Sequence, residues 1–330
     1  MSIMTSQQAL ADALAIEMRR DPSVLMFGEG VATKRAELLA EFGAGRVRNT
    51  PLAEGIIAGT AVGASAFGLR PVIDLLFAPF MCFAMDELVN SAGKLRFLSG
   101  GQFSFPLVAM AMTGGGWGIG PHHNHNLEAW FAHAPGLKVV MPSTPADAKG
   151  LLAAAIRDDN PVLFFSDIGL AFASGEVPEG EHCVPLGKAA LRRPGGDVSL
   201  VSYGKCVDTC LAAAETLATQ GVSAEVLDLR SLKPLDEQAI LASVRRTGRL
   251  VVVHEASRTC GVGAEVAALA SEAAFDSLRA PPCRLTGPDA PAAASFPLEQ
   301  AFAPSAAAVA AAVGRMLEGG GTVADAAAVA

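Results

Sequence analysis

Apolar residues in the first half of the chain fall in short continuous runs, separated by segments whose apolar positions recur three and four residues apart. The runs predict buried strands at SVLMFGEG, RPVIDLLF, PLVAMAM, LKVVMP and PVLFFSD, and the helical spacing predicts a helix over residues 145–157. An amphipathic helix is predicted near the N-terminus, where Leu10, Ala13, Leu14 and Met18 share one face. Strands of this kind alternating with helices indicate a mostly parallel sheet covered on both faces.

The same alternation resumes after a break at residues 175–197. The break contains three prolines, several glycines and mixed charges, a composition typical of an interdomain linker. Further strands are predicted at VSLVSYG, SAEVLDLR and GRLVVVHEA, with helices at 206–219, 235–246 and 263–274. We therefore predict an α/β protein with two doubly wound domains, over residues 1–185 and 186–317, and a flexible tail at 318–330.

Composition narrows the possible functions. The chain of 330 residues is 51% hydrophobic and 18% charged, with a net charge of −8, which disfavours nucleic-acid binding because that normally needs a basic face. No apolar run reaches the roughly 20 residues of a membrane-spanning helix, and the N-terminus lacks the order of a signal peptide. The high apolar content predicts a surface buried against another subunit. Six dispersed cysteines without a CxxC pair predict free thiols in a cytoplasmic protein, with Cys206 and Cys210 as packing residues.

Candidate reactive groups follow several predicted strands, where open α/β sheets bind ligands. Glu54 opens a helix whose other residues are mainly glycine, alanine and isoleucine. It is either a desolvated reactive carboxylate or a helix-start residue favoured by the helix dipole, and the local pattern does not decide between these. The glycines that follow, Gly55, Gly59 and Gly63, predict that another backbone packs closely against this helix.

Aromatic residues and histidines form two further groups. Phe77, Phe80 and Phe83 are typical of a core, although their proline-bracketed loop also suits presenting a ring to a flat heterocycle. TGGGWGIGPHHNHN is rich in glycine but lacks the Lys-Ser/Thr of a P-loop. Its three histidines have no cysteine or second histidine pair at ligand spacing, which disfavours zinc. Proton transfer, oxyanion contact and a structural role remain open for them.

Taken in order, these segments resemble the beta subunits of 2-oxo acid dehydrogenase decarboxylases of the pyruvate, branched-chain and acetoin types. The similarity runs from about Leu14 to Leu317. It lies in NTPLAEGIIAGTAVGASAFGLRP, DELVNSAGKLRFLSGGQ, HNLEAWFAHAPGLKVVMPSTPADAKGLLAAAIRDDNPVLFF, DLRSLKPLD, HEASRTCGVGAE and LTGPDAP…LEQAFAP. The resemblance implies an N-terminal pyrimidine-binding domain and a C-terminal transketolase-like domain.

The resemblance also implies thiamine diphosphate as cofactor and Glu54 as the chief catalytic residue. The matching glutamate bonds the aminopyrimidine ring and promotes the tautomer that activates the thiazolium carbon, a role that suits a desolvated carboxyl group. Phe80 matches the aromatic residue stacked on the pyrimidine, and His123 the histidine that assists the substrate and covalent intermediates. Glu29 and Leu76 are expected to be further cofactor contacts.

A potassium site of main-chain carbonyls and one carboxylate is a further implication of the resemblance. It consists of Leu107, Ala155, Ile156, Asp158 and Asn160. The alternative for the same residues is an ordinary helix end with backbone caps.

The chain does not carry the GDG motif and later asparagine with which thiamine enzymes hold Mg²⁺ and the diphosphate. The resemblance therefore implies an alpha subunit that supplies that half of the site, in an α₂β₂ heterotetramer. The implied activity is that of an oxidoreductase with a disulfide acceptor, EC 1.2.4-like. It decarboxylates a 2-oxo acid or cleaves acetoin, and passes the acyl group to a lipoyl-bearing acyltransferase core. The alternative is the C-terminal half of a split transketolase.

Three departures from the family pattern leave the substrate open. The segment between Glu29 and Asn49 is short, His125 stands where glutamine is common, and Ser166 stands where glutamate is frequent. None of these changes alters Glu54 or Phe80, so the cofactor prediction is unaffected.

Overall fold

The computed structural model describes residues 1–319, so residues 320–330 of the expected tail lie outside the described part. The chain forms two compact units. The first consists of Met1–Thr113, His122–Leu186 and Leu232–Pro234, and the second of Gly114–Pro121, Gly187–Ser231 and residues 235–319. We call Gly114–Pro121 the glycine loop; it belongs to the second unit although both its neighbours in sequence belong to the first.

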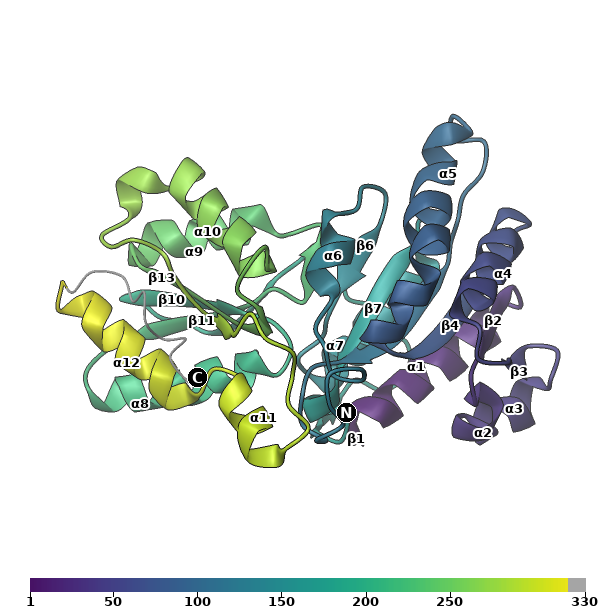
Figure 1. Ribbon diagram of the computed structural model, residues 1–330, viewed down its shortest axis with the longest axis horizontal. Coiled ribbons are helices and arrows are strands. Elements are labelled where there is room, and N and C mark those ends of the chain that lie inside the picture. Colours follow the sequence, from purple (N-terminus) through teal and green to yellow (C-terminus); the bar gives the residue numbers. More distant parts are fainter. Residues whose placement is uncertain (320–330) are drawn as a thin grey trace. The chain divides into compact units, whose positions relative to one another are not determined.

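The first unit is built on a seven-stranded sheet in the order β12-β6-β7-β5-β4-β2-β3 (Figure 1). From β6 to β3 in this order, each strand pairs in parallel with the next. Its strands are β2 (Val24–Gly28), β3 (Val47–Asn49), β4 (Arg70–Phe77), β5 (Val108–Thr113), β6 (Lys138–Val140), β7 (Val162–Asp167) and β12 (Ser231–Lys233). A separate antiparallel pair joins β1 (Ser2–Thr5) to β8 (Ser174–Val177).

Helix α1 (Ser6–Arg20) packs with α7 (Pro145–Arg157) over the apolar core of this sheet. It begins with a capping box, in which Thr5 accepts a hydrogen bond from the backbone of Gln8 and donates one from its own backbone to the Gln8 side chain. The predicted face of α1 is buried, which confirms the amphipathic helix. Buried Glu17 pairs with Arg157 of α7 at 2.6 Å, so burial of its charge is compensated.

The remaining helical segments of the first unit connect its strands. They are α2 (Val31–Lys34), α3 (Ala36–Phe42), α4 (Glu54–Ala66), the 3-10 helix η1 (Ala78–Ala84), the π-helical η2 (Asp86–Ala92), α5 (Gly93–Leu98), α6 (Glu128–His133) and the 3-10 turn η3 (Ile168–Leu170). Helix α4 packs against β4, η1 and η2. In residues 1–319 no helix is both long and apolar enough to cross a membrane.

The second unit contains a five-stranded sheet in the order β14-β13-β10-β11-β9, parallel except for the edge strand β9. Its strands are β9 (Ala190–Arg193), β10 (Val198–Ser202), β11 (Ala224–Asp228), β13 (Leu250–Ser257) and β14 (Cys283–Gly287). Helices α8 (Cys206–Thr219) and α12 (Ala306–Leu317) lie on one side of it, with α9 (Glu237–Thr247) and α10 (Val262–Ala273) on the other (Figure 1). The short helices are η4 (Phe275–Ser277) and α11 (Phe296–Phe302).

The predicted fold class is confirmed, since both sheets are mostly parallel and alternate with helices along the chain. Cys206 and Cys210 lie in the apolar core between α8 and the sheet, as packing residues would. Burial raises the pKa of Cys210 to about 12, so its thiol stays protonated and unreactive.

Candidate active site

The expected site residues follow four neighbouring strands of the first unit. Glu29 comes directly after β2, and Glu54 begins the helix after β3. Leu76 and Phe80 lie at and just after the end of β4, and His123 follows β5. Because β5, β4, β2 and β3 are adjacent and parallel, their carboxyl ends share one edge of the sheet, where open α/β sheets bind ligands.

Three aromatic rings meet at this edge. The ring of His123 lies 5.1 Å from that of Phe77 and 5.4 Å from that of Phe80, and the two phenylalanine rings are 5.8 Å apart. All three pairs are edge-to-face, a geometry that contributes about 0.5–1.5 kcal/mol per pair. The imidazole is therefore held by two rings from η1 and the end of β4. Phe83, whose pattern suggested a core position, is instead 71% exposed.

A distorted strand end directs these phenylalanines toward the histidine. Leu76 has a left-handed backbone with φ of 62°, and its N–H donates to Oδ1 of Asp74 at 2.9 Å. The pairing of β4 with β5 shifts register between Asp74 and Phe77. A left-handed conformation costs a leucine about 1–2 kcal/mol, so the surrounding contacts must offset it. Such an irregularity turns the chain out of the sheet and re-aims the side chains that follow.

Glu54 is the first residue of α4, and the preceding Ala53 offers no side-chain cap. The glutamate is half-buried. The next residue shows why small side chains are needed here, since a Cβ on Gly55 would lie 3.1 Å from the carbonyl oxygen of Phe83. The predicted close approach of another backbone is thus confirmed at Gly55, and the start of α4 lies against η1, the helix that contains Phe80. Gly63, in contrast, faces open space.

Two buried polar atoms near these strand ends have no hydrogen-bond partner among residues 1–319. They are the hydroxyl of Thr50 and the side-chain nitrogen of Asn126. Thr50 lies between β3 and Glu54, with its N–H donating to the oxygen of Gly28 at 3.0 Å, and Asn126 lies three residues after His123. An unsatisfied buried polar group costs about 1–3 kcal/mol, so both atoms are suited to a polar ligand.

Glu29 is half-buried between two glycines with positive φ, Gly28 and Gly30. A Cβ on Gly28 would lie 2.3 Å from the carbonyl oxygen of Asp74. Only glycine therefore lets β2 and β4 approach closely enough to bring Glu29 beside the end of β4.

The five residues expected to bind potassium lie together in the first unit, at the end of α7 and the start of β5. Their oxygens already have protein partners. Arg70 donates to the carbonyl oxygens of Ile156 and Asp158 at 3.0 Å each, and the N–H of Val162 donates to Leu107 at 2.9 Å. The carbonyl of Ala155 accepts from the backbone of Asp158 at 3.3 Å.

The carboxylate of Asp158 is paired as well. Lys138 forms an ion pair with it, and Asn160 donates to its other oxygen from backbone and side chain. Burial acts to raise the pKa of Asp158, but the hydrogen bonds from Lys138 and Asn160 outweigh it and hold that pKa below its usual value. Within residues 1–319, no group of three or more His, Cys, Asp or Glu side chains is arranged to hold a metal ion.

The glycine loop forms hydrogen bonds with charged side chains of the second unit. The N–H of Gly115 donates to Oε1 of Glu255 at 3.0 Å, and Lys205 bridges the Gly115 carbonyl (2.7 Å) and Glu255 (2.8 Å). The N–H of Gly118 donates to Oε2 of Glu299 at 3.0 Å. Both glutamates are buried, so these are charge-assisted bonds in a poorly solvated place. The loop is thus fixed on the second unit just before the chain reaches His123.

Comparison with known proteins agrees with this architecture. Residues 2–170 match the transketolase pyrimidine binding domain, and residues 187–309 the transketolase C-terminal domain. The beta subunit of acetoin:2,6-dichlorophenolindophenol oxidoreductase from Cupriavidus necator is 43% identical, over 94% of this chain and 97% of that protein. The 2-oxoisovalerate dehydrogenase subunit beta of Bacillus subtilis is 44% identical, over 88% and 91%.

The chain belongs to this family of dehydrogenase beta subunits. The pyruvate dehydrogenase E1 component subunit beta of Bacillus subtilis is a further member, 43% identical over 91% of this chain and 94% of its own length. Among solved structures, a split gene transketolase described as an inactive beta4 tetramer superposes with a TM-score of 0.80. It is 25% identical and covers 96% of this chain. The resemblance in the sequence is thereby confirmed, and thiamine diphosphate is the cofactor of this transketolase-like family.

Three residues at the edge were not among those expected for a beta-subunit site: Phe77, Thr50 and Asn126. The first had a usable signal, since Phe77 and Phe80 lie on either side of Pro79, where β4 ends and η1 begins. Thr50 had a weaker one, as a polar residue directly after a strand. Asn126 had none, because burial without a partner is a tertiary property.

Proposed function

We propose that this chain is the beta subunit of a thiamine-diphosphate-dependent dehydrogenase for a 2-oxo acid or acetoin, and that it forms the pyrimidine half of the active site. The observation that supports the proposal best is the convergence of Glu29, Glu54, Phe80 and His123 on adjacent parallel strand ends. A carboxylate, an aromatic group and an imidazole at one sheet edge are the groups that an aminopyrimidine ring and an oxo substrate require.

The residues at this edge fit the pyrimidine half of thiamine diphosphate. Glu54 offers a half-buried carboxylate and Phe80 an aromatic ring, while Thr50 and Asn126 offer buried polar atoms that lack partners among residues 1–319. When bound, thiamine diphosphate supplies a nucleophilic carbon that attacks the carbonyl group of the substrate. The diphosphate and its Mg²⁺ would be held by the alpha subunit, since this chain has no motif for them.

Each side chain then has a distinct task. Glu54 shares a proton with a ring nitrogen of the pyrimidine. This sharing is favoured where water is excluded. Phe80 shields that proton from solvent and covers the ring. His123, fixed edge-on by Phe77 and Phe80, donates or accepts a proton at the substrate oxygen. Glu29 and Leu76 complete the contacts to the cofactor.

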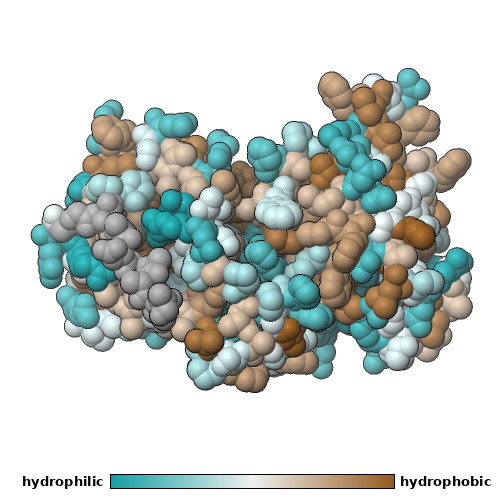
Figure 2. All heavy atoms as spheres, in the orientation of Figure 1, coloured by the Kyte–Doolittle hydropathy of each residue, from teal (hydrophilic) through white to brown (hydrophobic). Residues whose placement is uncertain are grey.

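An alpha subunit is the proposed partner, in an α₂β₂ heterotetramer. Large apolar side chains are exposed along α4 and α5, including Ile56 (73%), Phe67 (91%) and Phe97 (88%). Figure 2 shows apolar side chains gathered around the end of α5. Exposed apolar side chains in such numbers support a protein interface on these helices, because exposing them to water is unfavourable. A lipoyl-bearing acyltransferase core as acyl acceptor and a cytoplasmic location complete the proposal.

The decisive experiment is co-expression with an alpha subunit, followed by assays with pyruvate, branched-chain 2-oxo acids and acetoin. We expect thiamine-diphosphate-dependent turnover of one substrate class with a lipoyl or artificial electron acceptor. Ketol transfer between sugar phosphates, with no dehydrogenase activity, would instead establish the split transketolase alternative.

We propose further that potassium binds at the set formed by Leu107, Ala155, Ile156, Asp158 and Asn160, sharing oxygens with Arg70 and Lys138. In that case the melting temperature of the full chain should rise in potassium chloride relative to lithium chloride at equal ionic strength. Asp158→Asn should abolish the difference between the two salts. Identical melting curves for the unaltered chain in both salts would rule the site out.

A further inference from the structure

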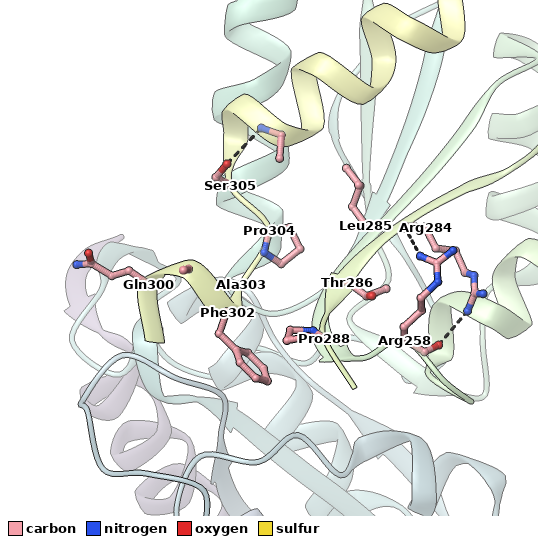
Figure 3. A pocket seen from close by; sticks show the side chains of 12 residues that line it. Arg258, Arg284, Leu285, Thr286, Pro288, Gln300, Phe302, Ala303, Pro304 and Ser305 are labelled. Atoms are coloured by element: carbon pink, nitrogen blue, oxygen red, sulfur yellow. Dashed lines mark hydrogen bonds between the residues drawn. The ribbon is translucent and has the colours of Figure 1, made fainter. Parts of the chain in front are cut away.

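A pocket lies in the second unit, and none of the residues that line it belongs to the proposed thiamine site. It has a volume of about 280 Å³ and lies between β14 and the turn that joins α11 to α12 (Figure 3). Pro288, Phe302 and neighbouring aliphatic side chains make its wall apolar. Two cationic side chains, Arg258 and Arg284, line it together with the hydroxyl of Thr286.

The two arginines hold each other in place. Nη1 of Arg258 donates to the carbonyl oxygen of Arg284 at 2.9 Å, and Nη1 of Arg284 donates to the carbonyl oxygen of Arg258 at 2.9 Å. Figure 3 draws both bonds as dashed lines. A guanidinium has five N–H donors, so each retains several for a ligand. These reciprocal hydrogen bonds hold both guanidinium groups in place before a ligand binds, which lowers the entropic cost of binding.

The positive charge of the two arginines is only partly offset by nearby carboxylates. In residues 1–319, neither guanidinium forms an ion pair with a carboxylate. Asp289 is the acidic group that Arg258 influences, but it is bonded to Thr259 at 2.7 and 3.0 Å and does not line the pocket. Two like charges held on one pocket wall repel each other, and an anion between them would relieve that repulsion.

The positive charge of the arginines also acts on the thiol of Cys283. Burial raises the pKa of Cys283, while Arg258, Arg315 and Arg284 all act against that rise.

The N-terminus of a helix lies at the same pocket. Ser305, which lines the pocket, caps the twelve-residue helix α12 by accepting a hydrogen bond from the N–H of Ala308 at 3.2 Å. The N-terminus of that helix adds about half a positive charge at the same opening.

We propose that this pocket binds a small organic oxyanion, with Arg258 and Arg284 taking its carboxylate or phosphate group and the apolar wall taking the remainder. The volume suits a compact metabolite, since it is at the lower end of the range for small-molecule sites. The paired N–H donors of a guanidinium bind the oxygens of a carboxylate and of a phosphate in the same way. Either group on a ligand would therefore be recognised by the same contacts. The site is independent of the proposed catalytic function.

The test is calorimetric titration of the full chain with inorganic phosphate and, separately, acetate, each at constant ionic strength set with chloride. We expect saturable binding of at least one anion at one site per chain. Arg258→Gln and Arg284→Gln should each weaken it about tenfold or more, because each removes a charge-assisted contact. Arg279→Gln is the matched control, since it removes one positive charge from the same unit outside the pocket lining and should leave the affinity unchanged.

Stronger binding of phosphate would indicate a phosphate ester as the natural ligand, and stronger binding of acetate a carboxylate. If a glutamine variant does not fold, Arg258→Lys and Arg284→Lys keep the charge without the paired N–H donors and should bind several-fold more weakly than the unaltered chain. The proposal is overturned if neither anion binds saturably. It is also overturned if the variants at 258 and 284 bind as tightly as the variant at 279.

Discussion

Glu54 and Glu37 both lie in the first turn of a helix, where the dipole favours any acidic side chain by about 0.3–1 kcal/mol. They differ in surroundings, because Glu37 is exposed on α3 whereas Glu54 is half-buried where α4 meets η1. The helix-start explanation therefore applies to both residues, and partial burial is what distinguishes Glu54, the proposed catalytic carboxylate.

This difference gives a direct test of the proposed catalytic carboxylate. Glu54→Gln keeps the shape of the side chain but removes the carboxylate that holds the proton, so turnover by the reconstituted complex should fall about 100-fold. The free energy of unfolding should change by no more than about 0.5 kcal/mol. Glu37→Gln, the matched change on α3, should leave turnover unaltered. Similar turnover in the two variants would refute the role of Glu54.

His254, in the second unit, has surroundings that keep its ring neutral, whereas His123 is proposed to transfer a proton. It is fully buried and stacked on Tyr203 at 5.7 Å. Its Nδ1 lies 3.1 Å from the carbonyl oxygen of Ala256, and its Nε2 accepts from the N–H of Gly263 at 3.2 Å. Burial lowers its pKa to about 4, so the ring is neutral at physiological pH.

The protein should therefore lose stability in mild acid. Between about pH 6.5 and 4 the unfolded chain binds a proton at this histidine that the folded chain does not, so the contribution is complete above pH 6.5 and lost as the pH falls. The loss amounts to roughly 3 kcal/mol over the whole window. Urea unfolding between about pH 7 and 5.5, where carboxylates titrate little, should show the decline. His254→Gln should flatten it, and an unchanged slope would contradict this assignment.

At the scale of elements, the glycine loop has a glycine-rich sequence, as phosphate-binding loops do, but its N–H groups bond to glutamate side chains of the protein. Its backbone N–H groups at Gly115 and Gly118 are already bonded to Glu255 and Glu299. A Cβ on Gly115 would lie 3.0 Å from Cγ of Glu299 and 3.1 Å from Oε1 of Glu255. Glycine is thus required here for close approach to two carboxylates and not for anion binding.

Gly115→Ala should consequently destabilise the chain by about 1–3 kcal/mol, because buried neighbours must move to accommodate the methyl group. The emission of Trp117, within the same loop, should shift as the loop is displaced; Trp130→Phe removes the other tryptophan of the chain. Gly45→Ala is the control, since nothing lies within 4 Å of the position that its methyl group would take. Equal stability of the two alanine variants would show that the glutamate contacts are dispensable.

At the scale of the whole molecule, two helix-interior glycines offer a test of the subunit interface. Gly63 on α4 and Gly314 on α12 both face open space, so alanine fits at either position. Each change should raise the free energy of unfolding of the separate chain by about 0.5–1 kcal/mol, since alanine has the higher helix propensity. If α4 packs against an alpha subunit, Gly63→Ala alone should weaken association, measured by sedimentation. Equal association of the two variants would place the interface elsewhere.

Much of this architecture follows from the sequence because its signals are local. The strand RPVIDLLF and the helix over residues 145–157 appear within a residue of their predicted limits, since continuous apolar runs and caps such as Thr144 are encoded by near neighbours. Strands β3 and β9 were not predicted, because they are short, carry charged residues and gain stability only from their sheet neighbours. The residues of the proposed active site were likewise visible in the sequence, but only as separate motifs.

By itself, the sequence determined the two α/β domains, the family and the candidacy of Glu54, Phe80 and His123, all properties that lie in contiguous segments. The tertiary structure alone decided three things: that Phe77 joins Phe80 around His123, that Glu255 and Glu299 grip the glycine loop, and that Arg258 and Arg284 share a pocket. These groups are brought together by strand order and by the path of the chain. Burial, partnership and charge balance depend on neighbours distant in sequence, so no local pattern contains them.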